Sequence, residues 1–191
     1  MKKLLLTLGA ALLLAQTFSS TLTTGTTAHA ETMPVSQSID SVALDTCNAS
    51  YTAADFEKAV ELIKRYETIH TPAHWPLVGY GHRVQRGEKI PRRQMSEAEA
   101  DALLRKDLQT MIDLFEGAGK DQLLLAVLAY SVGPYRILGT SEKSKSEMLR
   151  KIEAGDREIQ DEYLSYSRYK GRPHKGLLER RTEEFNTFYI D

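Results

Sequence analysis

The chain has 191 residues, a single cysteine and a formal charge of −1 at pH 7, which becomes −3 once the two lysines of the first three residues are set aside. No basic stripe stands out, so nucleic acid is a poor candidate partner. A lone cysteine excludes an internal disulfide. About 160 residues follow the N-terminal segment described next, enough for one domain with a buried core.

Residues 1–30 have the pattern of an export signal. Met1-Lys2-Lys3 is positive, residues 4–15 are apolar and uncharged, and Ala28-His29-Ala30 surrounds a polar residue with small ones, as signal peptidase requires. We expect cleavage before residue 31 and release across the inner membrane into the periplasm or the medium, without stable membrane insertion afterwards. An uncleaved anchor is the alternative. Cys47 lies too far from the cut for a lipoprotein.

Residues 31–51 are rich in Ser, Thr, Asp and Ala without periodicity, which predicts a flexible lead segment. A single domain is expected over residues 52–191. Its first helix begins at a capping box, Thr52 to Asp55, and places Glu67 on its last turn. Pro72 and Pro76 prevent the helix from continuing. Leu77 to Gly81 then reads as a short strand, followed by a turn at residues 86–88.

Helical patterns dominate the rest of the chain. Residues 96–115 open with a capping box and carry an apolar face, and residues 122–132 are apolar nearly all round, which predicts a central buried helix. Ser144 to Glu147 forms a third capping box, for a short helix ending at Gly155. Two more helices are expected over residues 157–166 and 177–189. The predicted class is α+β, mostly α, with about six helices and one small β-hairpin.

Glu67 is the candidate catalytic residue. The negative end of the helix dipole disfavours an ionised carboxylate at this position, and Trp75 with the following glycine-rich strand could wall a cleft. A carboxylic acid beside an apolar wall can protonate a glycosidic oxygen. Without further context, a glutamate at a helix end is more typical of a solvated surface.

Six segments, in order and at compatible spacing from about Ala54 to Tyr189, resemble the phage-type lysozymes of glycoside hydrolase family 24. In that family an aromatic residue directly precedes the acid, as Tyr66 precedes Glu67, and the next strand ends in Gly-x-Gly-His, as at Gly79 to His82. The segments are Ile63–Thr68, Val78–His82, Met95–Leu108, Ala126–Gly133, Leu149–Asp156 and Gly176–Glu184. The resemblance implies a lysozyme-like fold that cleaves the β-1,4 bond between N-acetylmuramic acid and N-acetylglucosamine of peptidoglycan strands, with Glu67 as general acid and no cofactor or metal.

The chain departs from this family in the segment after the acid. The family usually carries an Asp or Cys and then a Thr there, which place the attacking water. Residues 68–77 contain no Asp, Glu or Cys, and Leu77 stands where the Thr is expected. His70 and His74 are the candidates to position water in their place. The alternative is that both are solvated turn residues.

Other residues have candidate supporting roles. Tyr80 is a candidate to position substrate or water, and His82 to support the hairpin by hydrogen-bonding to backbone. The resemblance implies that the C-terminal helix packs near the cleft, so Arg180 or Arg181 could pair with Glu67 or a sugar substituent; an exposed helix face is the alternative. A metal cluster of Glu67 with the three histidines is disfavoured, because a proline interrupts their helical spacing.

Three functions remain open from the sequence. The first is the muramidase. The second is a lytic transglycosylase, which needs Glu67 alone because a hydroxyl of the sugar replaces water. The third is an inactive wall-binding module of a secretion or conjugation apparatus. Export of such a protein suggests controlled local opening of the wall, and an envelope-spanning machine is then a candidate partner.

Overall fold

A computed structural model describes residues 50–191. The predicted signal peptide, Cys47 and nearly all of the predicted lead segment lie outside the described residues. None of the helices in the described part combines the length and apolar character that a membrane span needs.

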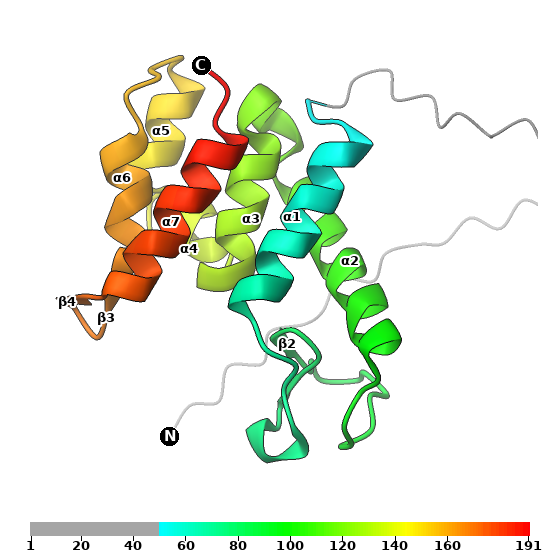
Figure 1. The fold of residues 1–191 in the computed structure, drawn as a ribbon. Helices are drawn as coiled ribbons and strands as arrows, with labels where there is room; N and C mark the ends of the chain where they lie inside the picture. The colour runs from blue at the N-terminus through cyan, green and yellow to red at the C-terminus, as the bar shows by residue number, and fades with distance from the viewer. Residues whose placement is uncertain (1–49) are drawn as a thin grey trace, which may run out of the picture. The chain divides into compact units, whose positions relative to one another are not determined.

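Seven α-helices and two short antiparallel hairpins make up residues 50–191 (Figure 1). The helices are α1 Ala53–Tyr66, α2 Glu97–Leu114, α3 Gln122–Val132, α4 Tyr135–Leu138, α5 Glu147–Glu153, α6 Gln160–Leu164 and α7 Lys175–Phe188. The hairpins are β1 Leu77–Val78 with β2 His82–Arg83, and β3 Arg168–Tyr169 with β4 Arg172–Pro173. Short 3-10 turns lie at Pro72–His74, Glu116–Asp121 and Ser165–Ser167. The α+β, mostly α class is confirmed, while α4 and the second hairpin were not expected.

Capping explains where the long helices begin. At α1, Thr52 Oγ1 accepts from the Asp55 N–H at 3.1 Å, and the Asp55 carboxylate accepts from the Thr52 N–H at 3.1 Å. The side-chain hydrogen bond from Thr52 lowers the pKa of Asp55 to about 2. The predicted box at the start of α2 also forms. The third predicted box is wrong, because Ser146 caps α5 by accepting from the Leu149 N–H at 3.2 Å.

Helix α3 is the centre of the fold, as its apolar sequence predicts. Residues 123–129 are all buried, and the helix packs against α1, α2, α4 and α7. Figure 1 shows α3 (yellow-green) between α1 and α7. Gly133, with φ of 85°, ends the helix in a conformation that favours glycine. The core therefore holds in place the two helices, α1 and α7, that bear the candidate site.

The hairpin after α1 is shorter than the predicted strand. Leu77 pairs with Arg83 and Val78 with His82, so the chain reverses through Gly79, Tyr80 and Gly81 rather than continuing as a strand. Gly79 has φ of 53°, and a Cβ there would lie 3.4 Å from the Met95 sulfur and 3.5 Å from Ala100 Cα. The turn is thus pressed against the start of α2.

Leu128→Ala tests whether α3 is the core. Leu128 is 0% exposed, so the truncation leaves a cavity and should lower the free energy of unfolding by about 2–5 kcal/mol in denaturant melts. Leu178→Ala is the matched control, because Leu178 is 45% exposed and its loss should change stability by about 0.5 kcal/mol or less. Equal losses in the two variants would show that α3 is not the centre of the core.

Candidate active site

Glu67 lies one residue beyond α1 rather than on its last turn. Its backbone is extended (φ −109°, ψ 120°), yet its N–H still donates to Ile63 O at 2.8 Å. Its side chain is 24% exposed. The carboxylate therefore leaves the helix end toward the β1–β2 hairpin while its backbone stays anchored to the helix.

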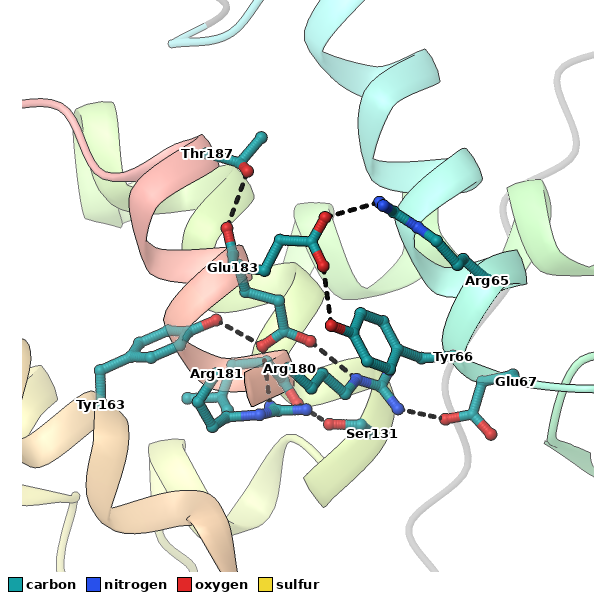
Figure 2. Close-up of polar contacts among 11 residues, drawn as sticks. Arg65, Tyr66, Glu67, Ser131, Tyr163, Arg180, Arg181, Glu183 and Thr187 are labelled. Atoms are coloured by element: carbon teal, nitrogen blue, oxygen red, sulfur yellow. Dashed lines mark hydrogen bonds and ion pairs between the residues drawn. The ribbon is translucent and has the colours of Figure 1, made fainter. Parts of the chain in front are cut away.

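Arg180 of α7 holds one oxygen of this carboxylate. Its Nη1 donates to Glu67 Oε1 at 2.6 Å, and its Nε donates to Glu184 Oε1 at 2.9 Å (Figure 2). The guanidinium also lies over the Tyr66 ring, 5.4 Å from its centroid. Burial opposes the charge, but Glu184 and Glu67 outweigh it and raise the pKa of Arg180. The predicted pairing with Glu67 is confirmed, and the alternative of an exposed helix face is wrong.

Glu184 is the second carboxylate partner of Arg180. It is 0% exposed and accepts from the Tyr163 hydroxyl at 2.9 Å, while Arg181 Nη1 lies 3.0 Å from its second oxygen. A buried carboxylate is tolerated only when it is paired and hydrogen-bonded. Each oxygen of Glu184 has its own arginine: Oε1 pairs with Arg180, which also holds Glu67, and Oε2 pairs with Arg181.

A second contact fastens α7 to the last turn of α1. The Tyr66 hydroxyl donates to Glu183 Oε2 at 2.7 Å, and Arg65 Nη2 lies 2.8 Å from Glu183 Oε1 (Figure 2). Arg65, Tyr66 and Glu67 are consecutive residues, and each contacts a residue of α7. The position of the acid is therefore fixed by its neighbours as well as by its own ion pair.

The second oxygen of Glu67 faces the hairpin turn. A Cβ on Gly81 would lie 3.9 Å from Glu67 Oε2, so the glycine backbone borders the carboxyl group. Gly81 has φ of 100°, which disfavours any other residue. Among residues 50–191, no group forms a hydrogen bond with Oε2. One oxygen is thus held and the other is open.

A cavity of about 380 Å³ adjoins this turn. Its lining includes Gly81, His82, Asp107 and Tyr130. Burial raises the pKa of Tyr130, and its hydroxyl donates to Tyr80 O at 2.8 Å, which fixes the phenol at the wall of the cavity. Gly81 borders both the cavity and Glu67 Oε2, whereas Glu67 itself is not among the residues that line the cavity.

The loop after Glu67 brings His70 and His74 together. Their rings meet edge to face, with centroids 5.1 Å apart. His70 Nδ1 lies 3.2 Å from Gly79 O, and His74 Nδ1 lies 3.1 Å from the Thr71 N. A carbonyl only accepts, so His70 Nδ1 carries a proton; a backbone N–H only donates, so His74 Nδ1 does not. His74 is exposed, His70 is half-buried, and neither forms a hydrogen bond with Glu67.

The side chain of Tyr80 is largely buried. It is 6% exposed, within the core, and Lys64 Nζ lies 5.7 Å from its ring centroid. The positioning role of Tyr80 stays a prediction, and its ring joins the turn to the core. The reason is that the turn reverses the chain at this point, which directs the side chain inward instead of toward the open side.

His82 bridges two carboxylates instead of bonding to backbone, which corrects the expected partner. Nδ1 lies 2.7 Å from Asp107 Oδ2 of α2, and Nε2 lies 3.0 Å from Glu88 Oε2. Burial disfavours the charged ring, but the hydrogen bonds to Glu88 and Asp107 outweigh it and raise the pKa of His82. The supporting role that the sequence suggested for His82 stays a prediction, with a defined partner on α2.

Sequence reasoning missed several residues of the site, namely Asp107, Tyr130, Glu183 and Glu184. An acidic residue four positions after Arg180 is a helical pairing signal that could have pointed to Glu184. The others are long-range partners without a local pattern. Within the part of the chain that the structure describes, no group of His, Cys, Asp and Glu side chains is arranged to hold a metal ion.

The chain is similar in sequence to one protein family and to one curated protein. The family model described as phage lysozyme matches residues 58–184. The endolysin of Bacillus phage B103 is similar, at 29% identity over 151 residues, which covers 69% of this chain and 52% of the endolysin. The chain thus spans about half the length of that curated relative.

The His82 bridge predicts a pH dependence of stability. Because its pKa is raised in the folded state, its contribution is fully present below the unfolded value of about 6.5 and is lost as the pH rises through the folded value. Relative to His82→Gln, the wild type should therefore lose its stability advantage above that pH in denaturant melts. Asp107→Asn completes a double-mutant cycle, in which the changes in the free energy of unfolding caused by Asp107→Asn and His82→Gln should be non-additive. Parallel pH curves for wild type and His82→Gln would rule out the charged bridge.

Proposed function

The chain belongs to the phage lysozyme family, whose model it matches over residues 58–184, and from this we propose that it is a peptidoglycan hydrolase with Glu67 as its general acid. In finer terms it is a muramidase, cleaving the β-1,4 bond between N-acetylmuramic acid and N-acetylglucosamine. The observation that carries the proposal is the asymmetry of Glu67: Oε1 is held by Arg180, while Oε2 is open beside Gly81.

The asymmetry suits proton donation. A protonated carboxyl group keeps one carbonyl oxygen, which still accepts the Arg180 hydrogen bond, so the proton resides on Oε2. The glycosidic oxygen then has to approach from the side of Gly81, where the absence of a side chain leaves room. Positioning of this kind is what general acid catalysis requires, because the donor must lie within hydrogen-bonding reach of the leaving oxygen.

The loop histidines are not equivalent candidates for the water-positioning role. Neutral His70 has its proton on Nδ1, bonded to Gly79 O, which leaves Nε2 as a free acceptor. Neutral His74 accepts through Nδ1 from Thr71 and carries its proton on Nε2. Only His70 can therefore accept a proton from water without giving up its loop hydrogen bond. We assign the positioning of water to His70, with His74 packed against its ring.

A lytic transglycosylase is the second candidate, and one observation favours it. Residues 68–77 hold no carboxylate, whereas an inverting hydrolase typically uses a second carboxylate roughly 6.5–9.5 Å from the acid. Mass spectrometry of the products separates the candidates. Reducing muramic acid ends indicate a muramidase, 1,6-anhydro ends a transglycosylase, and an absence of products from intact wall an inactive wall-binding module.

Export belongs to the same proposal. The positive start, the apolar run and the Ala-His-Ala site of residues 1–30 support removal of this segment and action in the periplasm or outside the cell. An envelope-spanning machine that needs a local opening in the wall is the partner that such a protein would suit. N-terminal sequencing of the exported protein checks the cleavage site.

Glu67→Gln tests the acid. The amide keeps the shape and still offers Arg180 an acceptor, but has no transferable proton, so clearing in a peptidoglycan gel should fall by roughly 100-fold or more while the melting temperature stays close to wild type. Glu61→Gln is the control, because Glu61 lies on the same helix and its side chain is 70% exposed; it should clear normally. Retained clearing in Glu67→Gln would move the chemistry to another residue.

His70→Ala tests the assignment of the water-positioning group. The rate should fall by roughly 100-fold, in kcat more than in KM, because the group acts in the transition state. His74→Ala is the matched loop variant and should lose far less. If both variants keep full activity and the products carry 1,6-anhydro ends, no residue positions water, and the transglycosylase replaces the muramidase.

A further inference from the structure

The β3–β4 hairpin and the first residue of α7 form a basic part of the described surface. Arg168, Lys170, Arg172 and Lys175 are all exposed, and no Asp or Glu occurs between Glu162 and Glu179. This concentration stands against a chain charge of −1. Four cations lie together on this projecting element, which we call the basic hairpin (residues 168–175) (Figure 1).

Few acidic side chains lie close to the cations of the basic hairpin. Lys175 lies 3.8 Å from Glu179, an exposed pair of small energetic weight. Within residues 50–191, Arg168, Lys170 and Arg172 form no ion pair; Arg168 Nη1 donates only to Gly171 O at 3.4 Å. Their charge is therefore available to an external anion.

The backbone conformation at the tip of the hairpin indicates that the side chain of Lys170 has a function. Lys170 has φ of 49° and is the one residue other than glycine with positive φ in the described part. Hairpin turns of this kind favour Asn, Asp or Gly at such a position, and a lysine there is strained, which points to function rather than stability. Both strands are exposed on both faces, so the hairpin contributes little to the core.

The basic hairpin adjoins the proposed catalytic apparatus. Strand β4 leads into α7, and Lys175 precedes Arg180, the partner of Glu67, by five residues, or about 7.5 Å along the helix. Tyr169 is 59% exposed beside the cations and offers a flat apolar surface. A polymer bound at the hairpin would thus run close to the element that holds the acid.

We infer that the basic hairpin docks the enzyme onto the stem-peptide carboxylates of insoluble peptidoglycan. The inference rests on the proposed wall substrate and adds a second contact to it, outside the catalytic centre. Exposed cations along a projecting element suit a polymer with repeated anionic groups, and the stem peptides supply carboxylates at regular intervals along the glycan.

The test measures binding to purified sacculi by sedimentation, with every protein in the Glu67→Gln background so that the wall stays intact. Lys170→Asn/Arg172→Gln removes two cations and should weaken binding roughly 10-fold, since two exposed charge contacts are lost; the effect should shrink with added salt. Lys120→Gln/Lys143→Gln is the matched control: it removes the same charge from exposed lysines elsewhere and should bind as the parent does. Asn suits the positive φ, so the melting temperature of the hairpin variant should not fall.

Further binding measurements distinguish stem-peptide carboxylates from other anions, and they distinguish failure of this inference from failure of the proposed function. Amidase-stripped glycan, which lacks stem peptides, should bind the parent as weakly as sacculi bind the hairpin variant. Equal weakening by the hairpin and control variants, undiminished binding to stripped glycan, or preference for phosphatidylglycerol vesicles or teichoic acid over sacculi would each overturn the inference. Failure of the proposed acid appears as lysis of the sacculi by the Glu67→Gln protein itself, so the two failures are distinguishable.

Discussion

The ion pair between Glu67 and Arg180 is the contact on which the site depends. It joins residues 113 positions apart, the end of α1 and the middle of α7, and its arginine is buried. Three carboxylates face three guanidinium groups there: Glu67, Glu183 and Glu184 with Arg65, Arg180 and Arg181. Arg180, Arg181 and Glu184 are buried, so removing one of them leaves a buried charge without its full pairing at a large cost, whereas Arg65, Glu183 and Glu67 are partly exposed and should cost less. The network therefore specifies how α1 and α7 meet as well as where the acid points.

This arrangement reconciles two demands on one carboxyl group. An ion pair needs an anion, whereas the proposed role of Glu67 as general acid needs a proton. Because Arg180 contacts only Oε1, it can keep its hydrogen bond in both protonation states, and Oε2 alone changes. Glu184 remains as the second partner of Arg180 throughout. Arg180 thus keeps a second carboxylate partner if Glu67 gives and takes a proton as proposed.

What could be predicted from the sequence was local. The capping boxes at Thr52 and Ser96, the buried face of α3 and the position of Glu67 at a helix end all follow from spacing of a few residues. What could not be predicted depended on distant partners or on an unusual backbone. The Tyr80 side chain points inward because the chain reverses at this residue. The second hairpin could not be predicted, because its strands contain arginine, tyrosine and proline and its turn has Lys170 in place of the usual Asn. Neither feature leaves a periodic pattern.

The tip of the basic hairpin also has a consequence for the lifetime of the protein. Exposed loop tips are preferred sites of proteolytic nicking. The hairpin presents two bonds to a trypsin-like protease, after Arg168 and after Lys170, because the bond before Pro173 resists such enzymes. A cut at Lys170 would leave α7 attached only through its packing and the charge network around Arg180. The nicked protein would then hold together at low ionic strength, yet shed its C-terminal helix under conditions that an uncut chain survives.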